Sequence, residues 1–324
     1  MKKLTPQAVL ERFRFSRKRG NALSFCFRRI FVTPSDSTWL QNALGYPVLA
    51  LFVFISLLPL WMALKIGLTY PNDVYTSASS LLPSAYTPGN FLRVMGLPST
   101  IELSAFRAAP IDFMLALRNS VIYTALTVTG QIFFSALAGY AFARMNFPGR
   151  NKLFFAFLAA TMIPSVVLFI PNFVLIKQLG LLNSFAGLVA PTILMTPFAV
   201  FFLRQFFLSA PKELDEAARL EGASQFQIFW RIALPIQKGP IATLAILLSI
   251  NSWNEFFWPF LVGRDPGVRV MAVALSDFMS QTGRGNPDWS GLMAAIMLSI
   301  LPVIAMLIIF GRQIVESLQT SGLK

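Results

Sequence analysis

The sequence contains no histidine and a single cysteine, Cys26, among its 324 residues. Catalysis or metal binding through histidine is therefore excluded, and no disulfide can form within the chain. Glycine is never followed directly by lysine, so the phosphate-binding loop of ATPases is absent and ATP hydrolysis is not expected. No Cys/His cluster suggests a metal site, and no nucleophile has a base near it. We expect a protein that is not an enzyme and binds no cofactor directly.

Charged residues are also scarce, at 13% of the chain, whereas hydrophobic residues make up 55%. The mean hydropathy of +0.63 is typical of a protein with several membrane spans. Apolar segments near the ~20 residues that cross a bilayer favour helices, because lipid offers no partner to an unpaired backbone group. Six such segments occur, at about 45–68, 119–142, 153–176, 185–208, 241–262 and 291–311. The fold class expected is an all-α integral membrane protein with six transmembrane helices.

The distribution of Lys and Arg predicts the orientation of these spans. With the N-terminus inside, 19 of the 27 cations lie in cytoplasmic segments and eight in outer ones, which follows the positive-inside rule and puts both termini in the cytoplasm. The predicted parts are a basic tail, the first span with an outer loop, a five-helix core and a C-terminal tail, at 1–42, 43–118, 119–311 and 312–324. We expect the basic tail to lie partly on anionic membrane lipid. Nucleic-acid binding is the alternative, which we do not favour.

A polar stretch at 211–240, here called the helical island, separates the fourth and fifth apolar segments. Pro211 is expected to open a helix, since the amide that proline lacks would have no partner there. Gly222 is expected to end this helix, because glycine tolerates the left-handed conformation. Ser224 is expected to cap a second short helix that ends before Leu234. The island is thus predicted to be a helix, a glycine turn and a helix.

Parts of the island sequence resemble a motif of a known protein family. EAA at 216–218, Gly222 shortly after it and IALP at 232–235 resemble the EAA loop of ABC importer permeases. The similarity runs from about the second span onward. With WNEF at 253–256 it resembles the sugar-importer branch, and within it the second permease of the maltose system. It implies the MetI-like fold of type I importer permeases in a bacterial inner membrane.

In that family the EAA loop is a coupling helix that docks into a groove on a separate ATPase subunit. The resemblance implies three partners: an ATPase dimer that uses ATP and Mg²⁺, a second and different permease, and a periplasmic substrate-binding protein. It implies alternating access, in which the ATPase dimer moves the island and the spans beside it. Phe229 and Trp230 are expected to be buried when the island is docked. The coupling residues expected are Glu216, Ala217, Ala218, Glu221, Gly222, Ala223, Leu234 and Pro235.

Two polar stripes recur at helical spacing inside predicted spans: Thr124, Thr127, Gln131 and Ser135, and Asn251, Asn254, Glu255 and Trp258. Polar side chains in a span face other helices or water. For the first stripe we favour the interpretation that it ties helices together. For the second we favour a solute path, because Trp and Asn can stack on and hydrogen-bond to sugar rings. The candidate path residues are Asn251, Trp253, Asn254, Glu255, Trp258 and Gln131.

Both long outer loops have a candidate role. The first, at 69–118, either touches a periplasmic partner or forms a small cap packed on itself. In the sugar permeases that the chain resembles, the loop corresponding to 263–290 enters the cleft of the binding protein, and we assign that role to 277–289. Residues 319–324 resemble a tail that touches the ATPase dimer, with a frayed terminus as the alternative.

The function expected is that of a permease subunit that imports a sugar or oligosaccharide, with an acidic polymer such as alginate as one suggestion. The alternatives are a self-sufficient secondary transporter or channel that uses Glu255, an ABC permease for a solute other than sugar, and a scaffold subunit without transport activity.

Overall fold

The structure is a computed structural model that describes residues 39–76, 80–82, 85–97, 112–281 and 288–321. The basic tail at 1–38, with Cys26, and the last three residues of the C-terminal tail lie outside the described residues. The chain divides into two units, Met1–Leu58 and Pro59–Lys324, and the contacts below belong to the second unit.

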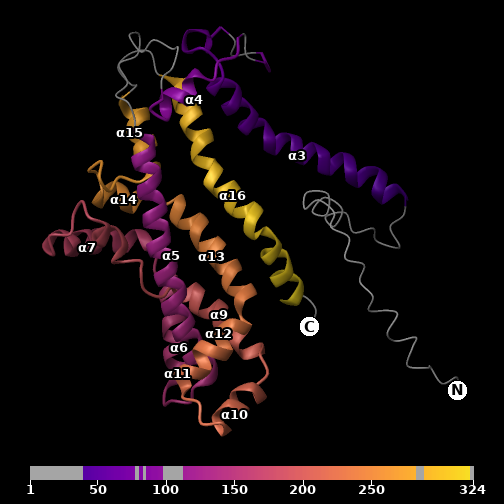
Figure 1. The fold of residues 1–324 in the computed structure, drawn as a ribbon, viewed down its shortest axis with the longest axis vertical. Helices are drawn as coiled ribbons and strands as arrows, with labels where there is room; N and C mark the ends of the chain where they lie inside the picture. Colours follow the sequence, from indigo (N-terminus) through magenta and orange to yellow (C-terminus); the bar gives the residue numbers. More distant parts are fainter. Residues whose placement is uncertain (1–38, 77–79, 83–84, 98–111, 282–287, 322–324) are drawn as a thin grey trace. The chain divides into compact units, whose positions relative to one another are not determined.

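Helices form almost all of the regular structure (Figure 1). In the described part of the chain, the only extended pairing is an isolated bridge between Thr69 and Tyr86. The expected all-α fold is confirmed. The helices are α3 (Trp39–Gly67), η2 (Pro71–Asp73), α4 (Gly89–Val94), α5 (Phe113–Arg144), α6 (Arg150–Ala159), η4 (Ala160–Met162), α7 (Ser165–Gln178), α8 (Phe185–Val189), α9 (Pro197–Ser209), α10 (Glu213–Leu220), α11 (Gln225–Ile228), η5 (Phe229–Ala233), α12 (Leu234–Ile236), α13 (Lys238–Trp253), α14 (Phe257–Val262), α15 (Met271–Gln281) and α16 (Trp289–Ser321).

Three helical stretches among the described residues are long and apolar enough to cross a membrane by themselves. They are Gly45–Gly67 in α3, all of α5, and Trp289–Ile309 in α16. Two further pairs of helices reach that length only if each bent pair is counted as one span. The first, second and sixth predicted spans are therefore single helices.

The other three predicted spans are broken, which the hydropathy pattern did not show. The third bends by 94° between η4 and α7, at Pro164, because proline forces the preceding Ile163 into extended backbone. The fourth is divided into α8 and α9, and α9 starts at Pro197. The fifth stops at Trp253 and resumes as α14 at Phe257.

Polar side chains of α5 satisfy backbone groups at the break in the fourth span. The Gln131 side chain donates to the Thr192 carbonyl at 2.7 Å, and the Ser135 hydroxyl accepts from the Thr196 amide at 3.3 Å. Broken backbone inside a membrane protein needs such partners, because lipid provides none. For Gln131 and Ser135, this is the helix-tying role that we favoured for the first polar stripe.

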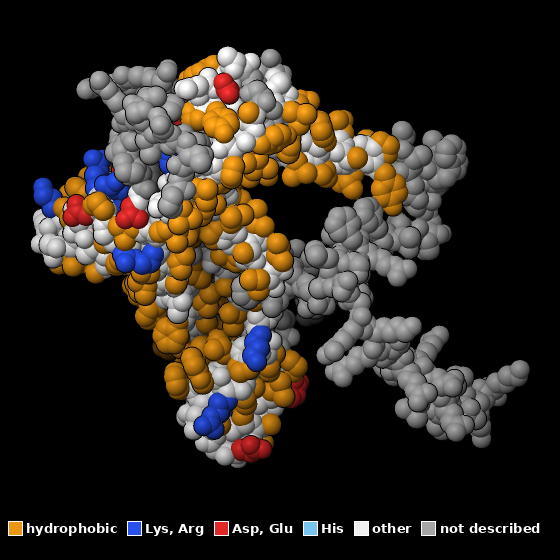
Figure 2. Space-filling view, turned by 45° about the horizontal axis from the view of Figure 1, so that its top comes forward, with side chains coloured by type: hydrophobic (Ala, Val, Ile, Leu, Met, Phe, Trp, Pro, Cys, Tyr) orange, Lys and Arg blue, Asp and Glu red, His pale blue; other side chains and the backbone are white. Residues whose placement is uncertain are grey.

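Helix α5 is the central element of the second unit. It packs along α9 and against α13. Gly139 allows α9 to approach closely, since a Cβ at this position would lie 3.1 Å from the backbone nitrogen of Arg204. In Figure 1, α10 and α11 lie at one end of α5, while α4 and α15 lie at the other. Figure 2 shows a largely apolar surface between these ends, with the charged side chains gathered toward them. This pattern is expected of a membrane-embedded bundle.

Candidate functional site

The helical island is built from α10, a glycine turn and a second helical segment, as predicted. Gly222 makes the turn with φ of 86°, in the left-handed region that favours glycine. Ser224 caps α11 with a complete capping box, in which its hydroxyl accepts from the Gln227 amide and the Gln227 side chain accepts from the Ser224 amide. These local contacts fix the angle between the two helical segments.

Two boundaries of the island differ from prediction. The first helix begins at Glu213, two residues after Pro211, with Lys212 at the cap position. The second segment does not end before Leu234, because it continues through a π-helical turn, η5, into α12. This wider turn ends immediately before α12, whose second residue, Pro235, has no amide to donate.

The predicted coupling residues occupy both sides of the island. Ala218 is buried in the core cluster between the island, α5 and α9, and Ala223 and Leu234 pack against that cluster. The exposed members face away from the core and are Glu216, Ala217, Glu221, Gly222 and Pro235. The motif therefore contains residues that attach the island and residues that are free to meet a partner.

Apolar side chains are also exposed on the island. Leu220, the last residue of α10, is 91% exposed, and Phe226 and Trp230 are 62% and 50% exposed. The rings of Phe226 and Trp230 stack, with centroids 6.3 Å apart. Phe229 does not belong to this surface: it is 2% exposed and packs against Tyr140 of α5, so it is already buried without a docked partner. Only Trp230 of the predicted pair is available to a partner.

Arg144, the last residue of α5, joins three elements at the base of the island. Its guanidinium donates to the Phe207 and Ala210 carbonyls, at 2.9 and 2.6 Å, where α9 ends. It also forms an ion pair with Asp215 of α10, at 3.7 Å. The side chains of Arg144 and Asp215 are only 6% and 9% exposed. Sequence reasoning counted Arg144 only among the cytoplasmic cations, because its partners are at least 63 residues away in the chain.

Two of the predicted path residues lie inside the protein core. Trp258 is 3% exposed and donates its indole hydrogen to the Leu188 carbonyl at 3.0 Å. Gln131 is buried at the break in the fourth span, as described above. Neither side chain is presented to a solute in this structure.

The remaining path residues lie at and just before the break in the fifth span. Asn251 and Asn254 are exposed, and Trp253 and Glu255 are half-buried. Glu255 accepts a hydrogen bond from the Trp258 amide at 3.2 Å, at the start of α14. The predicted second stripe does not run along one helix, because α13 ends at Trp253. The polar groups instead surround a helix break.

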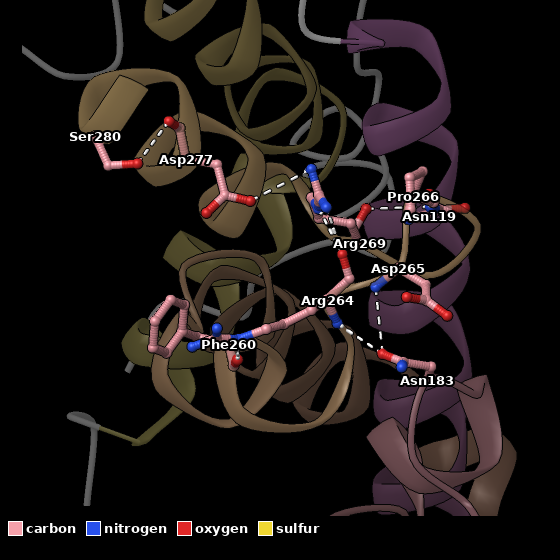
Figure 3. A network of polar contacts seen from close by, with 9 residues as sticks. All are labelled: Asn119, Asn183, Phe260, Arg264, Asp265, Pro266, Arg269, Asp277 and Ser280. Carbon is pink, nitrogen blue, oxygen red and sulfur yellow. Dashed lines mark hydrogen bonds and ion pairs between the residues drawn. The ribbon is translucent and has the colours of Figure 1, made fainter. Parts of the chain in front are cut away.

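At the other end of α5, the loop after α14 is held by two asparagines (Figure 3). The Asn119 side chain donates to the Pro266 and Arg269 carbonyls, at 3.0 and 3.1 Å. The Asn183 side-chain oxygen accepts from the backbone amides of Arg264 and Asp265. The loop is thus fixed to α5 and to the start of α8. Of the segment 277–289 assigned to the binding protein, 282–287 lies outside the described residues.

The described part of the first outer loop packs on its own helices. Lys65 is 2% exposed and donates to the Ser80 carbonyl at 2.7 Å, and Asn90 donates to the Gly67 and Thr69 carbonyls. Arg93 of α4 pairs with Asp288, next to the start of α16, at 2.6 Å. Of the two interpretations left open for this loop, these contacts favour the packed cap.

The fold and the island together define a membrane-embedded transport subunit with a polar helical attachment at one end. The family model described as "binding-protein-dependent transport system inner membrane component" matches residues 131–319, and the chain belongs to this family. It is a permease subunit of a binding-protein-dependent importer and a multi-pass membrane protein. The family identification made from the island is confirmed.

Similar proteins include two permeases and one solved structure. The arabinooligosaccharides transport system permease protein AraQ of Halalkalibacterium halodurans is 33% identical over 249 residues, covering 76% of this chain and 88% of that protein. The sn-glycerol-3-phosphate transport system permease protein UgpE of Salmonella typhi is 32% identical over 277 residues, covering 86% and 95%. A crystal structure of a bacterial ABC transporter involved in the import of the acidic polysaccharide alginate matches with a TM-score of 0.72 at 23% identity, covering 86% of this chain and 99% of that one.

Proposed function

We propose that this permease moves a sugar or oligosaccharide into the cytoplasm and that a separate ATPase dimer drives it through the helical island. The observation that carries this proposal is the island itself, a helical pair that packs on α5 and α9 and exposes Leu220, Phe226 and Trp230. Exposed apolar side chains grouped on one element are typical of a protein interface. The island would lie in the cytoplasm, with both termini.

The sugar assignment is supported by the relative named for arabinooligosaccharides, whereas the relative named for sn-glycerol-3-phosphate, a phosphorylated polyol, fits the alternative of a solute other than sugar. The likeness to the alginate transporter, at 23% identity, is a likeness of fold and adds nothing to the choice of substrate. Alginate therefore stays a prediction from the sequence.

A second, different permease and a periplasmic binding protein complete the proposed assembly. Switching such an assembly between inward-facing and outward-facing states, from 1:99 to 99:1, needs about 5.5 kcal/mol of differential binding. ATP-driven closure of the ATPase dimer on the docked island would supply it. For the solute path we propose Asn251, Trp253, Asn254 and Glu255 around the helix break, and we leave out the buried Trp258 and Gln131.

The test is to purify the tagged chain from its native membrane, identify the copurifying proteins and measure uptake in liposomes. A P-loop ATPase with a second permease, and uptake that requires ATP, are expected. Uptake without ATP by this chain alone would overturn the proposal in favour of the secondary transporter. In that case the Glu255→Gln variant, which removes the charge but keeps an oxygen for the Trp258 amide, would be the next to measure.

A further inference from the structure

We propose that Arg144 is a positioning residue for energy coupling: it forms the joint through which movement of the helical island reaches α5. This inference rests on the proposed function. The island is continuous in the chain with α9 before it and α13 after it, but it has no covalent connection to α5 within 60 residues. Any displacement of the island must therefore reach α5 through non-covalent contacts, made by the island itself or by α9 and α13, which pack against α5.

The electrostatics of the joint favour its position. Arg144 places a positive charge at the C-terminal end of α9, where carbonyls have no helical partner and the helix dipole is negative. Asp215 places a negative charge in the first turn of α10, where the dipole is positive. One buried guanidinium thus connects the end of one helix to the beginning of the next. Gln237 completes the connection by donating to the Phe206 carbonyl at 3.0 Å.

Contacts further along α5 show where the movement would go. Tyr140, one turn before Arg144, contacts Phe229 of the island and Phe207 of α9, with ring centroids 5.3 and 5.6 Å apart. Beyond it, Ser135 and Gln131 hold the broken backbone between α8 and α9. A shift of the island would therefore act on α5 and on the break inside the membrane together.

Arginine is suited to this joint in a way that lysine is not. Its planar guanidinium donates several hydrogen bonds in a fixed geometry, whereas a lysine ammonium is a flexible point charge. Arg144→Lys keeps the positive charge beside Asp215 but cannot hold both α9 carbonyls and the carboxylate in the same arrangement. Asp215→Asn keeps the size of the side chain and removes its negative charge, and with it the ion pair with Arg144 and the interaction with the dipole of α10.

The experiment compares uptake with ATP hydrolysis in the copurified assembly. Arg144→Lys and Asp215→Asn are expected to assemble normally and to hydrolyse ATP at near the unmodified rate, while solute moved per ATP falls about tenfold. Lys152→Met, which removes an exposed cation from the first turn of α6, is the matched control and should leave that ratio unchanged.

The proposal would be overturned if all three variants moved as much solute per ATP as the unmodified chain. It would also be overturned if Arg144→Lys and Asp215→Asn lost uptake and ATP hydrolysis in parallel. Loss of assembly in both variants would also overturn it, because the contact would then be structural only. These outcomes leave the proposed function intact. If no ATPase copurifies with the unmodified chain, the proposed function itself fails.

Discussion

Arg93 and Asp288, 195 positions apart in the chain, form a buried ion pair with atoms 2.6 Å apart and side chains that are 8% and 2% exposed. Asp288 also accepts from the Gly291 amide at 2.9 Å in the first turn of α16. Gly291 carries no side chain at a point where a Cβ would lie 2.5 Å from the Asp288 carboxylate. The pair thus fixes α4 to the start of the last helix.

Asp288→Asn should destabilise the protein by about 3 kcal/mol, since it leaves the Arg93 charge buried without its partner. The half-buried pair of Arg269 and Asp277, 3.3 Å apart with side chains 30% and 32% exposed, offers the control. Asp277→Asn should cost less than about 1 kcal/mol. Thermal unfolding in detergent measures both, and equal shifts in the two variants would contradict the prediction.

Gly222→Asp should leave the protein inserted but reduce uptake by about tenfold or more, because it places a side chain and a charge on the exposed island surface. Nothing lies within 4 Å of a Cβ at this position, but the φ of 86° strains the backbone of any residue other than glycine. Gly222→Asn is matched in size and tolerates the left-handed backbone equally well. Loss of uptake in both variants indicates that a side chain disturbs the turn or its docking, and loss in Gly222→Asp alone indicates an effect of charge. Normal uptake by an inserted Gly222→Asp protein would contradict the coupling role.

The parts of the structure that the sequence predicted well depend on local interactions. The long apolar helices, the Gly222 turn and the Ser224 cap each follow from residues within a few positions of one another. The breaks at Pro164 and before Pro197 were not predictable from hydropathy, since proline is tolerated in membrane helices wherever other groups satisfy the freed backbone. Whether such partners exist depends on which helix lies alongside.

In the candidate site, too, features that depend on local sequence were predicted and features that depend on distant contacts were not. The exposed motif residues of the island, such as Glu216 and Gly222, could be identified from the sequence alone. The roles of Arg144 and Trp258 could not, because they depend on contacts with residues far away in the chain. One signal was present for Arg144: it ends an apolar segment on the same predicted side of the membrane as Asp215.

Trp258→Phe should lower stability without changing the KM for uptake. The substitution leaves the Leu188 carbonyl without its donor in the core, which costs about 1–3 kcal/mol. Asn251→Leu, at an exposed position of the proposed path, should raise the KM with little effect on thermal unfolding. An unchanged unfolding temperature together with a raised KM in Trp258→Phe would contradict this prediction and would indicate that Trp258 belongs to the solute path.

Gly130→Ala tests whether α5 supports the broken fourth span. A Cβ at Gly130 would lie 2.6 Å from the Ile193 carbonyl oxygen, in the non-helical segment between α8 and α9, whereas the neighbouring Gln131 holds the Thr192 carbonyl. The added methyl must therefore push this segment away from α5, and such overpacking costs about 1–3 kcal/mol.

Gly239→Ala is the control, because Gly239 lies in α13 with nothing within 4 Å of a Cβ, and alanine stabilises a helix more than glycine does. Unfolding followed by tryptophan fluorescence should show a lower midpoint for Gly130→Ala and an equal or higher one for Gly239→Ala. Equal midpoints for Gly130→Ala and the unmodified protein would mean that the segment moves freely and that α5 does not fix the break.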